Sequence, residues 1–280
     1  MCIPVFPAAM RAEETGAGRG ASGGRTSAPR TFSVVLDELA AEHAALDEVV
    51  TPLTDLDWSL DTPADGWSIR DCIAHLRHFD GRAALAATEP ERFVAELGEE
   101  ARLVAATHAR FRQGHGDGLV AEWREARTAM IDAFTALPDD ARVPWYGPAM
   151  GTRSFITARL METWAHGQDV RDALGLPPLQ SDRLRHIAFI GWRARPFSYR
   201  NRGLDVPEGD VRVELTDPDV VLGESTTDVV RGSALDFALV VTQRRHRDDT
   251  SLVIEGPLAE DWMRIAQAFA GPPTDGRRPL

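Results

Sequence analysis

The sequence of 280 residues contains no lysine, so all 31 of its basic residues are arginines. This absence excludes Schiff-base catalysis and Walker-type phosphate binding, both of which depend on a lysine side chain. Only two cysteines are present, Cys2 and Cys72, and they do not form a Cys-x-x-Cys motif. A disulfide framework is therefore not expected, and we interpret Cys72 as a small apolar packing residue.

Long hydrophobic runs are absent as well, because no stretch approaches the roughly 20 apolar residues that a membrane-spanning helix needs. The apolar stretch at the N-terminus is too short for a secretory signal, so we expect a cytoplasmic protein with no membrane partner. A net charge of −12 argues against nucleic acid as a partner, since contact with phosphates needs a basic face. The remaining composition is that of an ordinary globular protein.

Composition and periodicity divide the chain into three parts. Residues 1–30 are rich in Gly, Ala, Ser and Arg and show no hydrophobic period, which predicts a disordered tail. Residues 31–180 carry apolar residues at helical spacing, whereas residues 181–280 combine strand-like and helix-like patterns. We therefore predict an α+β protein in which an N-terminal four-helix bundle precedes a small α+β domain.

Four long helical regions are expected in residues 31–180. Ser68 is a good N-cap for the second region, because Asp71 stands three residues later and can accept from the opening amides. Gly175, followed by two prolines, marks the end of the fourth region. The four regions cover residues 32–56, 68–83, 90–137 with a break at 114–118, and 155–174, with a loop at 138–151.

The last hundred residues predict a mixed structure. Strands are expected at residues 211–215, 226–230 and 251–255, where apolar residues alternate between turn signals. Helices are expected at residues 182–195, 234–242 and 259–270.

Two of the expected bundle helices carry residues of the kinds that bind metal ions. In the fourth, Glu162 and His166 stand four residues apart and therefore leave the same helix face. In the second, His75 lies between apolar residues and so faces the core or its border. Two histidines and one carboxylate can bind a divalent metal while leaving coordination positions open, as catalytic sites do. The sequence therefore predicts a metal site formed by His75, Glu162 and His166.

Several other histidines have competing interpretations. His78 is a rival ligand one turn after His75, but its charged neighbours favour a more solvated position, either behind the ligands or at the surface. His43, on the first expected helix, is placed at the surface or at the boundary of the core, with a position lining the cavity as the alternative. His108 and His115 flank a glycine-rich break and are expected in solvent.

Asp169 and four tryptophans have expected roles that follow from their positions in the sequence. Asp169 follows His166 by about one turn, so it either orients the ligand imidazole or forms a salt bridge with Arg171 or Arg195. Four tryptophans are interpreted as walls of the core or of a cavity: Trp58, Trp67, Trp145 and Trp164.

An inward histidine on the second helix and Glu-x-x-x-His on the fourth together resemble the DinB-like superfamily. Residues 162–170, Glu-Thr-Trp-Ala-His-Gly-Gln-Asp-Val, are similar to its mycothiol-dependent maleylpyruvate isomerase branch. In that branch a DinB-like helix bundle precedes a sterol-carrier-like α+β domain. Residues 236–250 and 262–271 further resemble an actinobacterial family of DinB-like metal-binding proteins. The resemblance extends from about residue 32 to the end of the chain.

The resemblance implies a chemistry as well as a fold. It implies that His75, Glu162 and His166 bind a divalent metal, usually zinc. It also implies a cofactor, a low-molecular-weight thiol such as mycothiol, that binds the metal as the thiolate. An arginine from the C-terminal domain, Arg244 or Arg245, would then bind a substrate carboxylate. The competing interpretation is that this arginine cluster only complements a helix dipole.

Three functions are consistent with these observations. The leading hypothesis is a metal-dependent transferase or isomerase that uses a thiol and acts on a carboxylated or apolar small molecule. The second is a biosynthetic enzyme that uses the same cavity for a cyclisation or rearrangement without a thiol. The third is a non-catalytic protein that binds a small molecule. The sequence leaves open whether the chain is a monomer or a homodimer.

Overall fold

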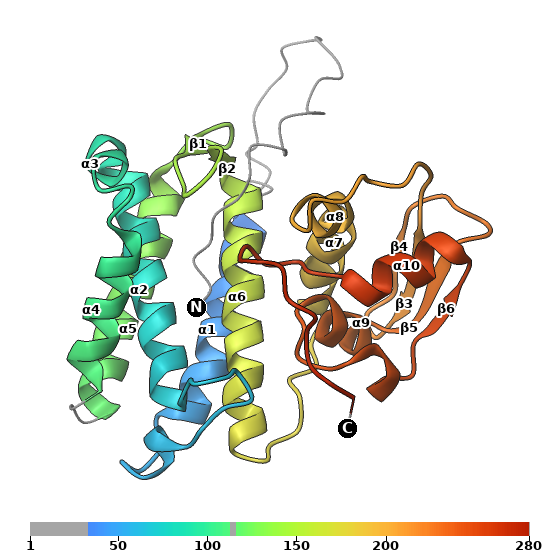
Figure 1. The fold of residues 1–280 in the computed structure, drawn as a ribbon. Coiled ribbons are helices and arrows are strands. Elements are labelled where there is room, and N and C mark those ends of the chain that lie inside the picture. Colours follow the sequence, from blue (N-terminus) through green and yellow to red (C-terminus); the bar gives the residue numbers. More distant parts are fainter. Residues whose placement is uncertain (1–32, 113–115, 280) are drawn as a thin grey trace, which may run out of the picture.

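The computed structural model describes residues 33–112 and 116–279. The tail predicted for residues 1–30 therefore lies outside the described residues. Within them, four long helices pack side by side in the N-terminal half (Figure 1). Their bounds are α1 (Ser33–Val50), α2 (Ile69–Thr88), α5 (Gly116–Ala136) and α6 (Thr152–Ala173).

The ends of α2 and α6 follow the signals in the sequence. Ser68 caps α2 in a capping box, in which its hydroxyl accepts from the Asp71 amide and the Asp71 carboxylate accepts from the Ser68 amide. Gly175 follows α6 with a φ of 65°, a conformation that glycine adopts without a steric penalty. Both predicted boundaries are confirmed. They matter because these two helices carry the candidate ligands.

The segment between α2 and α5 differs from the expectation of one interrupted helix. It forms two helices, α3 (Pro90–Ala95) and α4 (Glu100–Phe111), of which α4 packs along α2. Gly116 lies inside α5 and not in a loop. A Cβ atom on Gly116 would stand 1.9 Å from Nε1 of Trp58, so this first turn of α5 requires a residue without a side chain.

The loop expected at residues 138–151 contains a short ladder. Strand β1 (Arg142–Val143) pairs with strand β2 (Met150–Gly151) in antiparallel register. This pairing holds the chain at the N-terminal end of α6.

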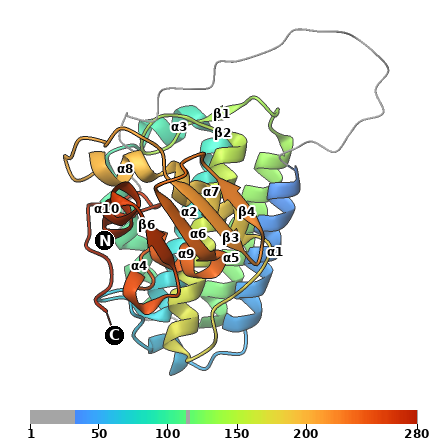
Figure 2. The same cartoon turned by 90° about the vertical axis from the view of Figure 1, so that its right-hand side faces the viewer.

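The C-terminal half is a four-stranded mixed sheet with helices packed against it. The strand order is β4-β3-β5-β6, in which β3 and β5 are parallel and the two outer pairs are antiparallel. Figure 2 shows this sheet in front of the long helices. The elements are α7 (Leu184–Arg193), α8 (Arg195–Arg200), β3 (Arg212–Thr216), β4 (Val220–Leu222), β5 (Val229–Ser233), α9 (Ala234–Val241), β6 (Val253–Glu255) and α10 (Pro257–Ile265).

Several predictions for this half were wrong in detail. The strand expected at residues 226–230 lies at Val229–Ser233, and the helix expected at residues 182–195 ends at Arg193 and is followed by α8. Strand β4 was not expected, because its three residues are too few to show an alternating pattern. The last helix was expected to reach residue 270, but α10 ends at Ile265 and Ala266 is extended. The buried Gln267 side chain donates to the carbonyls of Phe269, Gly271 and Pro272, which stabilises a non-helical path.

One hydrophobic core extends from the long helices into the C-terminal half. It includes Leu160 and Trp164 of α6, Ile187 of α7 and Phe237 of α9. A second core fills the other end of the bundle around Cys72, Leu76 and Trp123. The C-terminal half is therefore packed directly against α6, the helix that carries two of the candidate ligands.

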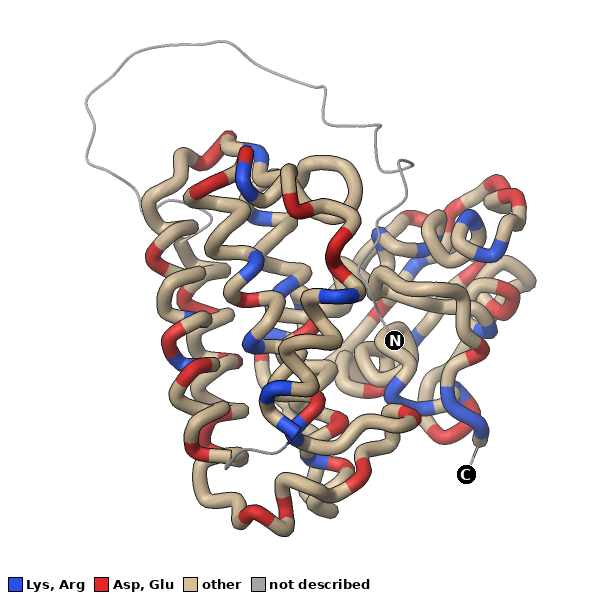
Figure 3. Tube along the Cα trace, turned by 60° about the vertical axis from the view of Figure 1, so that its left-hand side comes forward, with Lys and Arg blue, Asp and Glu red and all other residues tan. Residues whose placement is uncertain are grey.

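Charged residues of both signs are interspersed along the trace (Figure 3). Acidic residues outnumber basic ones, and the net charge is −12. Among the described residues, no helix combines the length and the apolar character needed to cross a membrane.

Candidate metal centre

Helices α2 and α6 pack against each other and bring His75 beside Glu162 and His166. Ligand-type atoms of these three residues all lie within 4.8 Å of one another. The two imidazole rings have centroids 4.7 Å apart, and His166 Nε2 lies 3.6 Å from Glu162 Oε2. The structure thus places together the three residues expected to form a site, and metal binding by them stays a prediction.

The burial of this group is uneven. His75 and His166 are buried, whereas the side chain of Glu162 is 19% exposed. Burial, and then the neighbouring His166, lowers the pKa of His75 well below its usual value. His75 is therefore neutral at physiological pH, the state in which an imidazole nitrogen can bind a metal.

Asp169 lies on the side of His166 away from Glu162. Its Oδ2 is 3.4 Å from His166 Nδ1 and accepts from Arg244 at 2.7 Å, while its Oδ1 accepts from Arg277 at 2.8 Å. Burial alone would raise the pKa of Asp169, but Arg244 and His166 outweigh it and the pKa is lowered. Asp169 is therefore an anion beside His166 Nδ1, a buried atom that has no hydrogen-bond partner among the described residues.

The expected salt-bridge partners of Asp169 were wrong. Arg171 donates to the carbonyl of Pro177, and Arg195 donates to carbonyls of residues 207 and 209. The arginines that reach Asp169 come from the segment after α9 and from the C-terminal end of the chain. Neither position could be paired with Asp169 from sequence spacing, because each is more than 70 residues away.

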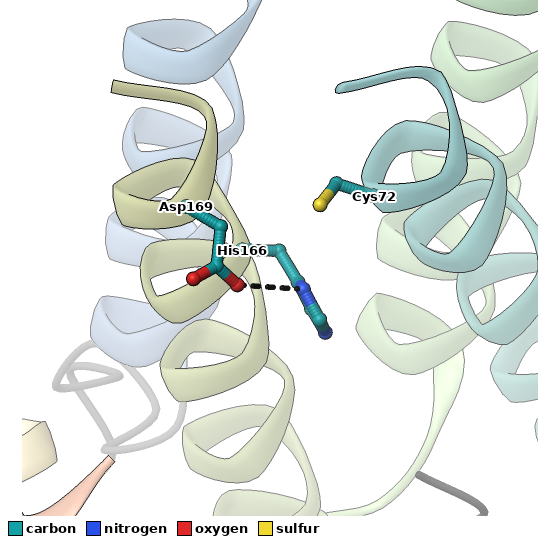
Figure 4. A group of neighbouring side chains, drawn as sticks. All are labelled: Cys72, His166 and Asp169. Atoms are coloured by element: carbon teal, nitrogen blue, oxygen red, sulfur yellow. Dashed lines mark ion pairs between the residues drawn. The ribbon is translucent and has the colours of Figure 1, made fainter. Parts of the chain in front are cut away.

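A second group of possible ligands overlaps the first. Cys72, His166 and Asp169 also lie within 4.8 Å of one another, with Cys72 on α2 and the other two on α6 (Figure 4). Burial, followed by the charge of Asp169, raises the pKa of the Cys72 thiol well above its usual value. Because a thiol must lose its proton to bind a metal and Asp169 is already held by two arginines, the group with Glu162 has the more suitable donors.

Trp67 covers the histidine pair, which agrees with its interpretation as a wall of the core or of a cavity. Its ring stacks on His166 and meets His75 edge-on, with centroids 5.4 Å and 5.1 Å apart. Trp67 directly precedes the N-cap of α2. A hydrophobic residue at that position often packs over the first turn, and this was the available signal.

His108 also lies at this site, and the expectation that it is solvated was wrong. Its Nδ1 is 3.0 Å from Asp71 Oδ1, and its ring packs against Trp67. Among the described residues, Nε2 of His108 has no hydrogen-bond partner although it is buried. His108 lies on α4, 33 residues after His75 in the chain, so no local sequence pattern could have indicated that the two lie close together. His115 lies outside the described residues.

The surface positions expected for His78 and His43 were wrong for a related reason. His78 is buried and bonds to Thr107 and Glu100 of α4, which covers the face that its charged neighbours suggested was open. His43 is buried as well, with Nε2 3.6 Å from Asp80. Neither residue belongs to the group of possible ligands around His166.

The two arginines expected near the site follow α9 and contact the face of α6 that packs against the C-terminal half. Arg244 donates to the Ala165 carbonyl and to Asp169, whereas Arg245 makes two bonds to Asp172 at 2.6 and 2.7 Å. Arg244 is therefore the one that reaches the carboxylate beside His166. Their role toward a substrate stays a prediction.

The chain matches known proteins in sequence and in fold. A family model described as the mycothiol maleylpyruvate isomerase N-terminal domain matches residues 39–171. Two proteins of Mycobacterium tuberculosis, from different strains and named Uncharacterized protein MT0041 and Uncharacterized protein Rv0036c, are each 40% identical over 255 residues. The match covers 86% of this chain and 96% of each relative.

Two solved structures share the fold. A mutant of the mycothiol-dependent maleylpyruvate isomerase superposes with a TM-score of 0.57 at 15% identity, over 81% of this chain and 96% of that one. A second crystal structure of the mycothiol-dependent maleylpyruvate isomerase gives a TM-score of 0.53 at 14% identity, over 81% and 95%. At these identities the likeness is one of fold.

Proposed function

The chain belongs to the mycothiol-dependent maleylpyruvate isomerase branch of the DinB-like superfamily, a family of enzymes, and from this premise we propose a thiol-dependent isomerase or transferase of small molecules. The observation that carries the proposal is the group formed by His75, Glu162 and His166, whose ligand-type atoms lie within 4.8 Å of one another. Zinc bonds of about 2.0–2.2 Å in a tetrahedral site place ligand atoms about 3.3–3.6 Å apart, so the most separated of these side chains would move closer by about 1 Å when zinc binds.

The donor set fits a divalent cation, and zinc is the ion we propose. His75 is neutral, and its Nδ1 is buried without a hydrogen-bond partner among the described residues. Two imidazoles and one carboxylate leave a coordination position open for a further ligand. A zinc ion held there supplies one chemistry: it lowers the pKa of a bound thiol, so that a thiolate is present at neutral pH.

The surrounding side chains have separate roles in this proposal. The charge of Asp169, 3.4 Å from His166 Nδ1, favours a proton on that nitrogen and leaves the Nε2 lone pair on the side of Glu162. Trp67 lies flat on His166 and keeps water from that face. His108, oriented by Asp71 through Nδ1, presents Nε2 as the atom that accepts the thiol proton.

We propose Arg244 as the residue that binds a substrate carboxylate. It lies between α6 and the C-terminal half, bonded to Asp169 and to the Ala165 carbonyl one residue before His166. A carboxylate that entered here would share or replace Asp169 as its partner. Arg245, which is bonded to Asp172 through both terminal nitrogens, is the weaker choice.

The finer assignments of fold and location belong to the same proposal. We propose that residues 31–180 form a DinB-like four-helix bundle and that residues 181–280 form a sterol-carrier-like domain. The packing of α1, α2, α5 and α6 supports the first, and the mixed sheet with helices supports the second. The cytoplasm is the proposed location, because low-molecular-weight thiols are kept reduced there.

The test is metal content together with thiol-dependent turnover. We expect near-stoichiometric zinc in the purified protein, and turnover of maleylpyruvate, or of a related unsaturated carboxylate, only when mycothiol is added. Glu162→Gln is expected to lose both. Glu125 is an exposed glutamate on α5, and Glu125→Gln makes the same chemical change away from the site. This variant is expected to keep both the zinc and the thiol-dependent turnover.

The alternatives give different results in the same experiment. Turnover of an electrophile without any thiol would favour the biosynthetic enzyme. Binding of a small molecule that survives His75→Ala, with no turnover under any condition, would favour the binding protein. A protein that binds no zinc, nickel or iron after reconstitution would contradict the metal-activated thiolate.

A further inference from the structure

The chain after α10 returns to α6 as an extended segment. After Ile265 it leaves the helix, and the Ala268 amide donates to the carbonyl of Val241 at the end of α9. The buried Gln267 amide donates to Ser198 Oγ at 3.0 Å, which attaches the segment to α8. We name residues 266–279 the C-terminal strap. Figure 1 shows it passing beside α6.

Gln243 fastens the far part of the strap. Its side-chain amide donates to the carbonyls of Ala266 and Thr274, and its Oε1 accepts from Thr274 Oγ1 at 3.0 Å. The backbone of Gln243 has a φ of 59°, which is costly for a residue with a side chain. These three bonds, with one from Arg202 to the Thr274 carbonyl, help to hold that conformation. The strap is therefore fixed just before Arg277.

Arg277 links the C-terminal strap to the candidate metal centre through Asp169. Its Nη2 donates to Asp169 Oδ1 at 2.8 Å, and its Nε donates to the Gln243 carbonyl at 3.4 Å. Arg244 takes the other oxygen of Asp169, so each oxygen of this buried carboxylate has its own arginine. A carboxylate held at both oxygens cannot rotate freely about its terminal bond.

We infer that Arg277 is a positioning residue for His166, acting through Asp169, so that the C-terminal strap is part of the metal centre. The inference rests on the proposed function, since it concerns the same site. A carboxylate fixed beside Nδ1 of a ligand histidine selects the tautomer protonated there and leaves the Nε2 lone pair for the metal. Without Arg277, Asp169 Oδ1 loses the arginine that holds it, and the carboxylate can turn away from His166.

The first test is zinc affinity, measured by competition with a chromophoric chelator. Loss of a residue that supports a metal ligand weakens binding by about 10–100-fold, and we expect at least the lower value for Arg277→Gln. Arg278→Gln is the matched control, because Arg278 directly follows Arg277 in the chain and its side chain is exposed. Arg277→Lys, which keeps a charge but not the fork, is expected to restore part of the affinity.

A double-variant comparison separates positioning from general structure. In an Asp169→Asn background, Arg277→Gln should change the zinc affinity less than about twofold, because its route to His166 has been removed. If the loss of zinc affinity in the double variant equals the sum of the losses, as free energies, in the two single variants, the inference is overturned. Circular dichroism and urea unfolding of each variant show whether the fold is kept, and Arg277→Lys supplies the test if Arg277→Gln does not fold.

A second readout does not depend on bound metal. Long-range ¹H–¹⁵N spectra of the metal-free protein report the tautomer of each histidine, and His166→Asn identifies the His166 signals. We expect one tautomer, protonated at Nδ1, in the unmodified protein and in Arg278→Gln, and a mixture in Arg277→Gln. An unchanged tautomer in Arg277→Gln would overturn the inference.

The two readouts distinguish the failure of the inference from the failure of the proposed function. Zinc binding that is lost in His166→Ala but unaffected by Arg277→Gln overturns the role of Arg277 alone. Absence of zinc binding in the unmodified protein contradicts the proposed function. In that case the tautomer spectra still decide whether Arg277 positions His166.

Discussion

Trp67 lies parallel to His166, with 5.4 Å between the ring centroids and 5° between the ring planes. The same indole meets His75 and His108 edge-on, so one side chain contacts three histidines from α2, α4 and α6. Trp67 therefore closes one side of the candidate metal centre. Its position directly before the cap of α2 fixes where the indole can lie.

Substitution of Trp67 is expected to lower zinc affinity and turnover, and to lower them more when the aromatic ring is removed than when it is replaced by a smaller one. Trp67→Ala should lower zinc affinity and thiol-dependent turnover, because water gains access to His166 and its ring is no longer held. Trp67→Phe keeps an aromatic face and should retain most of both. Chelator competition and initial rates check this, and equal effects of the two changes would contradict the stacking role.

The choice between the two overlapping ligand groups can be tested at Cys72. Because burial raises the pKa of its thiol well above the usual range, Cys72→Ser should leave zinc binding intact, whereas Glu162→Gln should abolish it. In a Cys2→Ser protein, the remaining thiol should react with a disulfide reagent only after denaturation. Zinc loss in Cys72→Ser would assign the metal to the other group.

Removal of one partner from the buried pair of Asp80 and Arg159 is expected to destabilise the fold strongly. Asp80 is fully buried and accepts from Arg159 at 2.8 Å and from Trp123 Nε1 at 3.1 Å. Asp80→Asn leaves the arginine buried without its counter-charge, and we expect a loss of about 3–5 kcal/mol in the free energy of unfolding. Urea denaturation measures it.

An exposed pair provides the control for that measurement. Glu99 and Arg102 form an ion pair on the surface of α4. Glu99→Gln should change the free energy of unfolding by less than about 1 kcal/mol, because solvent screens such pairs. Similar losses at Asp80 and Glu99 would show that burial does not set the strength of these interactions.

Stability is expected to fall as the pH is lowered from about 6.5 toward 4. Burial, partly opposed by Asp80, lowers the pKa of His43 from 6.5 to about 4. The unfolded chain therefore binds a proton in this range before the folded chain does, and the protonation stabilises the unfolded state. His75 contributes in the same direction.

His43→Asn should make the stability less dependent on pH within this range. Urea unfolding of metal-free protein at pH 7.5 and at pH 5 measures the difference, and the absence of metal keeps ligand protonation from contributing through zinc release. A pH dependence as large in His43→Asn as in the unmodified protein would contradict the assignment to His43.

Local chemistry in the sequence was sufficient to locate the ligand-bearing helices. The Ser68–Asp71 capping box and the glycine after α6 depend on neighbouring residues alone, and both were predicted correctly. The spacing of Glu162 and His166 also follows from the helical repeat. These features involve contacts within a few residues, so a single sequence contains their signals.

The packing of helices against one another decided the rest of the candidate site. His78 and His108 were expected near solvent, but α4 covers His78 and brings its own residue His108 against Asp71 and Trp67. The sequence carries no sign of which helix lies over which face. Strand β4 was missed because three residues have too short a pattern.

The sequence by itself determined which side chains share the ligand-bearing faces of α2 and α6. Only the tertiary structure decided that Arg244 and Arg277 meet at Asp169, 75 and 108 residues away along the chain. The physical reason is that helix caps and periodicity are set by local backbone bonds. The pairing of buried charges is set by how the C-terminal half and its strap close against α6.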